Sequence, residues 1–140
     1  MSSAAALYTS EVLALATALA HFPLADDLPL RGAARSATCG SSIEAGLACS
    51  ATGIIERVGL CTHACAIGQA AAAVFANHAT GRNLAELSQA AVQIEAWLAG
   101  GALPAWPGFA AIAAARDYPA RHGAVLLAWR AALVALAAPR

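Results

Sequence analysis

The spacing of apolar residues predicts an amphipathic helix near the start of the chain, over residues 8–21. The apolar positions that recur at near-helical spacing are Leu7, Val12, Leu15 and Leu19. Pro23 and the acidic pair at 26–27 then close the segment. Residues 28–38 have no helical stripe and contain Pro29 and Gly32, which is typical of an edge strand followed by a loop.

The pattern changes to alternation after residue 42, which is typical of β-strands. The positions that share one face of this strand are Ile43, Ala45, Leu47 and Cys49. Thr52 and Gly53 supply a turn, and a second alternating segment then returns to Cys61. The simplest interpretation is a hairpin whose second strand ends with Cys61 and His63, just before a helix that begins near Cys65.

Two helices are predicted after the hairpin. The first should run from about Cys65 to about His78, because a threonine and a glycine at 80–81 form a stop signal. The second has an N-cap at Asn83, with Glu86 three residues further on, and ends at the glycine pair 100–101.

The C-terminal part is predicted to contain a loop with a short helix at 103–117, and then a last helix. Pro119 suits the first turn of that helix, whose apolar positions are Leu126, Leu127, Trp129, Leu133 and Leu136. The order of elements predicts an α+β fold, in which a small antiparallel sheet of about three strands is packed with four to five helices that cover one face. We expect residues 1–140 to form a single domain.

Composition narrows the classes of function. Hydrophobic residues make up 60% of the chain, half of them alanine, which favours closely packed helices. We expect no membrane-spanning helix, because Glu11 interrupts the first apolar run, the run at 64–76 is too short, and Arg130 interrupts the last. The net charge is zero and the eight basic residues are scattered, which argues against a nucleic-acid surface. With four cysteines and no export signal, the thiols are expected to be reduced in the cytoplasm.

Candidate chemistry is concentrated around the end of the hairpin, at Cys61, His63 and Cys65. Cys65 is expected beside the free N–H groups and the positive dipole end of a helix, which favour thiolate. Cys39 lies in the loop before the hairpin, and antiparallel pairing should return the chain to that end, so these two thiols are expected to approach. His122 is then the best third ligand, because imidazole and thiolate together suit zinc or iron.

The remaining cysteine and histidine residues have simpler interpretations. Cys49 alternates with apolar residues and is expected in the core. His21 and His78 lie at predicted helix ends, where a capping or surface role is favoured. Cys61 stays open between an extra ligand, a resolving thiol for Cys65 and a small strand residue, and His63 between a ligand or proton donor and a surface residue.

Several segments together resemble the U-type iron–sulfur cluster assembly scaffolds, the family of SufU, IscU and the NifU N-terminal domain. They are T-C-G at residues 38–40, A-C-A-I-G-Q-A-A-A-A from Ala64, G-R-N-L from Gly81, and Y-P-A-R followed by L-L-A-W near the end. The similarity extends from Leu7 to Leu136. A long spacer between Cys65 and Pro119 is closer to the SufU branch, and the Leu-Pro-Pro-Val-Lys segment expected of the IscU branch is absent from the sequence.

The resemblance implies an α+β fold in which three cysteines and an aspartate, in some members with a histidine, hold zinc or a transient [2Fe–2S] cluster. The first two cysteines correspond to Cys39 and Cys65. The aspartate of the C-G-D motif is replaced by Ser41, and the third cysteine by Ala124. Cys39, Cys65 and His122 are therefore the expected metal ligands, with Cys61 and His63 as further candidates.

The resemblance implies a scaffold or carrier, not an enzyme, although a sulfurtransferase-like role stays open. The expected partners are a cysteine desulfurase and iron–sulfur acceptor proteins, with no nucleic acid and no membrane. Without the third cysteine and the aspartate of the family, the site has three possible roles. In the first, His122 completes a rearranged zinc or cluster site. In the second, Cys65 and Cys61 accept sulfur without stable metal. In the third, the site is degenerate and the protein only binds partners. A thiol-redox protein that uses Cys61 and Cys65 is the competing class.

Overall fold

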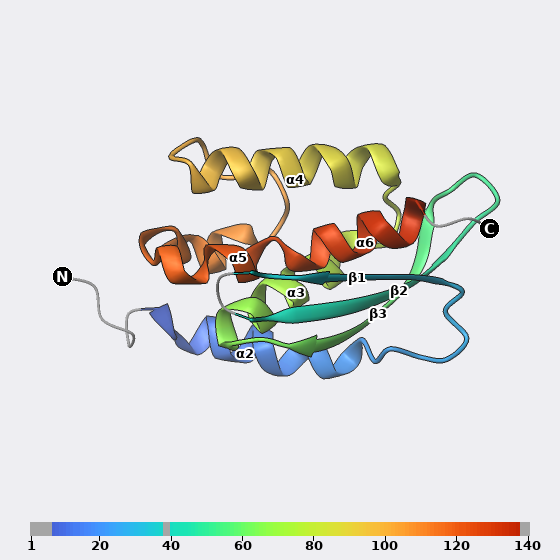
Figure 1. Ribbon diagram of the computed structural model, residues 1–140, viewed down its shortest axis with the longest axis horizontal. Helices are drawn as coiled ribbons and strands as arrows, with labels where there is room; N and C mark the ends of the chain where they lie inside the picture. The colour runs from blue at the N-terminus through green and yellow to red at the C-terminus, as the bar shows by residue number, and fades with distance from the viewer. Residues whose placement is uncertain (1–6, 38–39, 138–140) are drawn as a thin grey trace.

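The computed structural model describes residues 7–37 and 40–137. The helical elements are α2 (Ser10–Ala18), α3 (Ala66–Ala79), α4 (Leu84–Leu98), α5 (His122–Val125) and α6 (Leu127–Ala137), with three 3₁₀ segments, η1 (Leu19–His21), η2 (Phe109–Asp117) and η3 (Pro119–Arg121). The strands are β1 (Leu30–Arg35), β2 (Ser42–Cys49) and β3 (Ile55–His63). The expected α+β fold is confirmed, and Figure 1 shows α4 and α6 above the sheet, α3 behind it and α2 below it.

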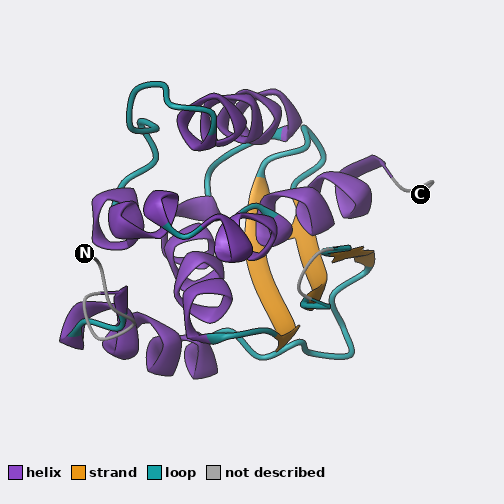
Figure 2. Cartoon of the chain, turned by 60° about the vertical axis from the view of Figure 1, so that its left-hand side comes forward, coloured by secondary structure: helices purple, strands orange, loops and turns teal. Residues whose placement is uncertain are grey.

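The three strands form one antiparallel sheet in the order β1-β2-β3. Ser42 at the start of β2 lies opposite Arg35 at the end of β1 and His63 at the end of β3. Helices pack on one face, which we call the inner face, and Figure 2 shows them gathered on that side of the sheet. The inner-face residues of β2 are the alternating set expected from the sequence, Ile43, Ala45 and Leu47, all of them buried.

The small residues allow α6 and α3 to approach their neighbours closely. Gly32 of β1 faces α6, and a Cβ atom there would lie 2.2 Å from the carbonyl oxygen of Ala131 and 2.4 Å from the amide nitrogen of Ala135. Most of α3 is buried, including an unbroken run over residues 70–76. Alanine packs such an interior helix without the volume of larger side chains, so the apolar sequence is explained by burial within the fold.

The opposite, outer face of the sheet is partly covered by the connection between η1 and β1. Gly46 and Gly59 are cross-strand neighbours on this face, and a Cβ atom at Gly59 would lie only 2.3 Å from the carbonyl oxygen of Pro23. The connection therefore crosses directly over the backbone. Arg31 holds one side of it through bonds from Nε and Nη2 to the carbonyl oxygens of Leu28 and Ala25, at 2.9 and 2.6 Å.

On the other side of this connection, Arg57 donates two hydrogen bonds of 2.9 Å to the carboxylate of Asp27. These hydrogen bonds, together with the positive charge of Arg57, lower the pKa of Asp27 below its ordinary value of 3.8. Beyond the paired Gly46 and Gly59, toward Ser42 and His63, no other described segment covers the outer face.

The C-terminal segment differs from the expectation in two respects. The predicted last helix is three successive pieces, η3, α5 and α6. Within the described residues, Pro119–Ala137 is also long and apolar enough to cross a membrane by length and composition, with a mean hydropathy of 1.3 despite Arg130, so the expectation that no segment would qualify was wrong. Half of its most apolar window is buried inside the fold, where Trp129 contacts Phe75 and Trp106. Burial of this kind is ordinary for a core helix.

Candidate functional site

Three segments that are distant in the sequence meet at one end of the sheet. These are the connection between β1 and β2, the junction of β3 with α3, and the turn that leads into α5 (Figure 1). Ser36 and Ser41 close the β1–β2 connection, since the Ser36 amide donates to the Ser41 carbonyl at 2.8 Å. The pairing of Ser42 with His63 then places this connection beside the start of α3.

Cys65 is the N-cap residue of α3, as the sequence predicted. Its thiol is half-buried against the core and makes no capping hydrogen bond with the helix N–H groups. The backbone carbonyl of Cys65 instead accepts from the amide of Gln69 at 2.9 Å. The thiol is thus held at the N-terminus of a 14-residue helix.

Helix α5 packs against the first turns of α3. Ala124 is completely buried there, and a Cβ atom placed on Gly68 would lie 3.2 Å from the Ala124 Cβ and 2.7 Å from the Ala64 Cβ. The position that the resemblance assigns to the third cysteine therefore lies against the N-terminal part of the helix that begins after Cys65. The space around it is closed by small side chains.

His122, two residues before Ala124, is half-buried at the start of α5. Its Nε2 atom lies 2.7 Å from the carbonyl oxygen of Arg116. A carbonyl only accepts hydrogen bonds, so Nε2 carries a proton, and in the neutral form of the ring the lone pair is on Nδ1. A backbone carbonyl that receives the second ring N–H is the usual partner of a metal-binding histidine.

The other expected ligands have different outcomes. Cys39 lies outside the described residues. Ser41, at the position of the family aspartate, is described and buried. Within residues 7–37 and 40–137, no three histidine, cysteine, aspartate or glutamate side chains come together as a group that could hold a metal ion.

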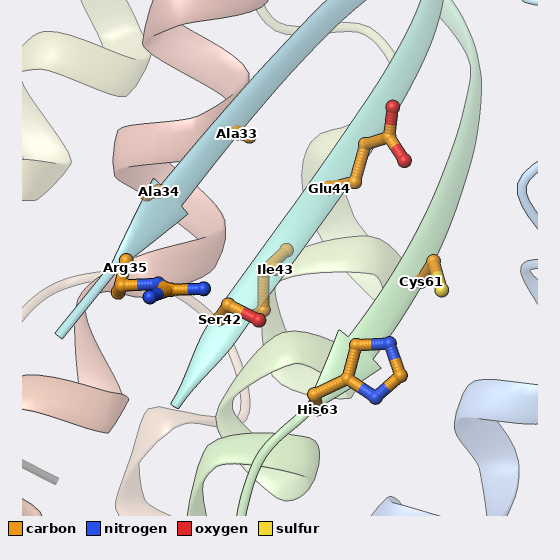
Figure 3. A pocket seen from close by; sticks show the side chains of 8 residues that line it. All are labelled: Ala33, Ala34, Arg35, Ser42, Ile43, Glu44, Cys61 and His63. Carbon is orange, nitrogen blue, oxygen red and sulfur yellow. The ribbon is translucent and has the colours of Figure 1, made fainter. Parts of the chain in front are cut away.

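Cys61 and His63 lie on the outer face, away from Cys65. Both are exposed, and they line a shallow hollow with Arg35, Ser42 and Glu44 (Figure 3). Cys65 in contrast packs against the hydrophobic core, and the described cysteines are all free thiols. This placement gives no support to a redox pair of Cys61 with Cys65.

Sequence reasoning missed Arg35 and Glu44, which share the hollow with Cys61 and His63. The register places Glu44 directly opposite Cys61, and alternation puts both on the outer face. The sequence signal for this site was the set of polar positions that alternate with the apolar positions along the two strands. The pairing of the strands was needed to see that these polar residues lie together. The remaining predictions of placement hold, since Cys49 packs on the core while His21 and His78 are exposed near helix ends.

Comparison with known proteins identifies the class. No protein-family model and no curated protein matches the sequence, but the arrangement of sheet and helices is that of the U-type scaffold proteins, as the sequence resemblance implied.

In particular, the chain is similar to the N-terminal part of a nitrogen-fixing NifU-like protein from Brucella abortus, with 26% identity, a TM-score of 0.82 and coverage of 93% of this chain and 92% of that one. It has the fold of a putative SUF-system iron–sulfur cluster assembly scaffold protein from Fervidobacterium islandicum AW-1, with 19% identity, a TM-score of 0.82 and coverage of 93% and 96%. A third structure, of a hypothetical protein, has 21% identity, a TM-score of 0.72 and coverage of 89% and 96%.

Proposed function

We propose that this protein is an iron–sulfur cluster assembly scaffold or sulfur-acceptor accessory protein of the SufU type. The observation that carries the proposal is the meeting of three segments at one end of the sheet, in a fold shared with scaffold proteins over almost the whole chain. Those segments carry Cys39, Cys65 and His122 in the sequence. The proposal treats the chain as one scaffold domain that carries cargo and catalyses no reaction.

The donors fit a soft metal better than a hard one. Cys65 contributes a thiol at a helix N-terminus, and His122 contributes a neutral imidazole whose Nδ1 is left available by the bond from Nε2 to Arg116. With the thiol of Cys39 they would make two sulfur donors and one nitrogen donor, a set suited to zinc or to the iron of a [2Fe–2S] cluster. Water would complete the set, because Cys61 and His63 line the hollow on the outer face, away from the Cys65 thiol.

Partners follow from the same role. A cysteine desulfurase would supply sulfur, and iron–sulfur acceptor proteins would receive the assembled cluster. Reduced thiols are needed at each stage, so the proposed location is the cytoplasm.

The degenerate alternative, a module that only binds partners, is favoured by the environment of Ala124. The third family cysteine is replaced here by a methyl group that is completely buried against α3. Sulfur acceptance without stable metal is the intermediate alternative. Both alternatives predict a protein without stably bound metal, whereas a scaffold should bind zinc or a cluster, so metal analysis distinguishes them from the scaffold.

The test is to purify the protein without oxygen, measure zinc and iron, and then reconstitute it with ferrous iron and sulfide while recording the [2Fe–2S] absorption. The wild-type chain should carry about one zinc ion or develop the cluster spectrum. Cys39→Ala and Cys65→Ala should each abolish binding, and His122→Ala should weaken it by roughly 10- to 100-fold, as expected for loss of one ligand or its orientation.

The matched controls are Cys49→Ala and His78→Ala. Cys49 lies at the far end of β2 from Ser42, and His78 is exposed in the last turn of α3, so both variants should bind as the wild type does. No metal in either the purified or the reconstituted wild-type protein would overturn the scaffold proposal and favour the partner-binding module. Labelling of Cys65 by a persulfide in metal-free protein would favour sulfur acceptance.

A further inference from the structure

The hollow lies on the outer face of the sheet, whereas the Cys65 thiol packs against the core. The hollow has a volume of about 380 Å³, within the usual range for small-molecule sites. Its floor spans all three strands, so it is about 10 Å wide from β1 to β3. The connection that covers Gly46 and Gly59 stops short of the hollow, which no other segment within the described residues covers.

The thiol in this hollow is the accessible one among the three described cysteines. Cys61 is exposed, whereas Cys49 and Cys65 are half-buried and pack against the core. Within the described parts of the chain, the Cys61 thiol makes no hydrogen bond. His63 lies two positions further along β3 on the same face, where its ring stands beside Cys61 (Figure 3).

The hollow also contains one positive and one negative side chain that are free of ion pairs within the described residues. Arg35 on β1 extends toward Ser42 of β2, and Glu44 on β2 stands opposite Cys61 (Figure 3). Elsewhere in the described part of the chain, three ion pairs join Arg57 to Asp27, Arg82 to Glu86 and Arg130 to Glu95, and none of them includes a residue of the hollow. Arg35 and Glu44 are therefore available to a ligand that carries both signs of charge.

We propose that this hollow binds small zwitterionic thiols of the amino-acid type, such as glutathione, and that they become attached to Cys61 as a mixed disulfide. Arg35 would bind a carboxylate of the ligand and Glu44 its ammonium group, which holds the ligand sulfur over Cys61. A tripeptide thiol matches the width of three strands. The site goes beyond the proposed scaffold function and needs neither Cys39 nor Cys65.

The reaction is thiol–disulfide exchange, with the disulfide form of the ligand as oxidant. The Cys61 thiol loses its proton to solvent, and the thiolate attacks one sulfur of the ligand disulfide. A new bond forms between Cys61 Sγ and that sulfur as the ligand S–S bond breaks. The other half leaves as a thiolate and takes up a proton, so electrons and protons balance.

The test is to incubate the full chain with glutathione disulfide and locate the adducts by peptide mass spectrometry. Cys61 should be modified at least tenfold faster than Cys49 or Cys65, and Cys61→Ser should remove the fast adduct. Arg35→Gln and Glu44→Gln should each slow the reaction by about two- to fivefold, the scale of one exposed charge contact. The matched control is Glu56→Gln, an exposed glutamate of β3 outside the hollow.

An uncharged reagent, bis(2-hydroxyethyl) disulfide, separates ligand recognition from simple exposure. Its rate with Cys61 should be the same in the wild type and in the Arg35→Gln and Glu44→Gln variants. In addition, S-methylglutathione, which forms no disulfide, should slow alkylation of Cys61 by iodoacetamide. Equal effects of the two charge substitutions on both disulfides, or no protection by S-methylglutathione, would overturn the proposal.

Discussion

Replacing Gly32 by alanine should separate α6 from the sheet. The added Cβ atom would lie 2.2 Å from the Ala131 carbonyl oxygen, 2.4 Å from the Ala135 amide nitrogen and 3.0 Å from the Ala135 Cα. Ordinary contacts between non-bonded heavy atoms are about 3.5 Å. All three atoms belong to the helix backbone, so no side-chain rotation relieves the overlap, and α6 must move outward by about 1 Å.

The cost follows from what α6 buries. Its inner positions include Leu127, Trp129 and Ala132, each fully buried, and a shift opens gaps around them. Overpacking in a core usually costs about 1–3 kcal/mol, and the rigid backbone contacts place this substitution near the upper limit. We expect a loss of about 3 kcal/mol in the free energy of unfolding, which lowers the melting temperature by roughly 10 °C for a domain of this size.

Urea and thermal unfolding followed by circular dichroism would measure this loss. The control is Ala33→Val, which adds two methyl groups at the next position of β1, where the side chain is exposed on the outer face. That variant should stay within about 0.5 kcal/mol of the wild type. A Gly32→Ala protein that is equally stable would refute the close approach of α6 to β1.

Three further substitutions test other parts of the structure. Asn83→Ala removes the hydrogen bond of 3.0 Å that the Asn83 side chain accepts from the Glu86 amide at the start of α4. The free energy of unfolding in urea should fall by about 1 kcal/mol. A loss below about 0.3 kcal/mol would contradict a capping role for Asn83. Because Arg57 lowers the pKa of Asp27, the ion pair stabilises the fold above pH 3.8, and this stabilisation is lost as the pH falls through the lowered pKa. Arg57→Gln should therefore reduce the loss of stability at acid pH, measured as the melting temperature against pH. An unchanged pH profile would refute this prediction. Ala124→Cys should raise metal content and affinity, measured by zinc competition, by at least about tenfold, and an unchanged affinity would exclude this position as a ligand site.

Local signals in the sequence account for most of the predicted elements. Asn83 with Glu86 marked the start of α4, and the alternation from Ile43 marked β2, because capping and side-chain period depend on nearby residues. The break between α5 and α6 was not predicted. Leu126 separates the two helices, and the apolar pattern continues through it without a proline or glycine.

The site was less predictable because it depends on contacts between distant segments. The bond from His122 to the Arg116 carbonyl joins two turns that the sequence does not place relative to each other. The pairing of Glu44 with Cys61 depends on the register of the hairpin, which contains an irregularity at Ala48 and Cys49. The covering of Gly46 and Gly59 was also not predicted, because it depends on the close approach of the connection between η1 and β1.

The most direct test of the scaffold proposal is the metal content of protein purified without oxygen, compared between the wild type, Cys65→Ala and Cys49→Ala. The account predicts about one zinc ion per chain, or a [2Fe–2S] spectrum after reconstitution, in the wild type and in Cys49→Ala, and neither in Cys65→Ala. Metal that is absent from all three proteins, or that stays bound in Cys65→Ala, would contradict it.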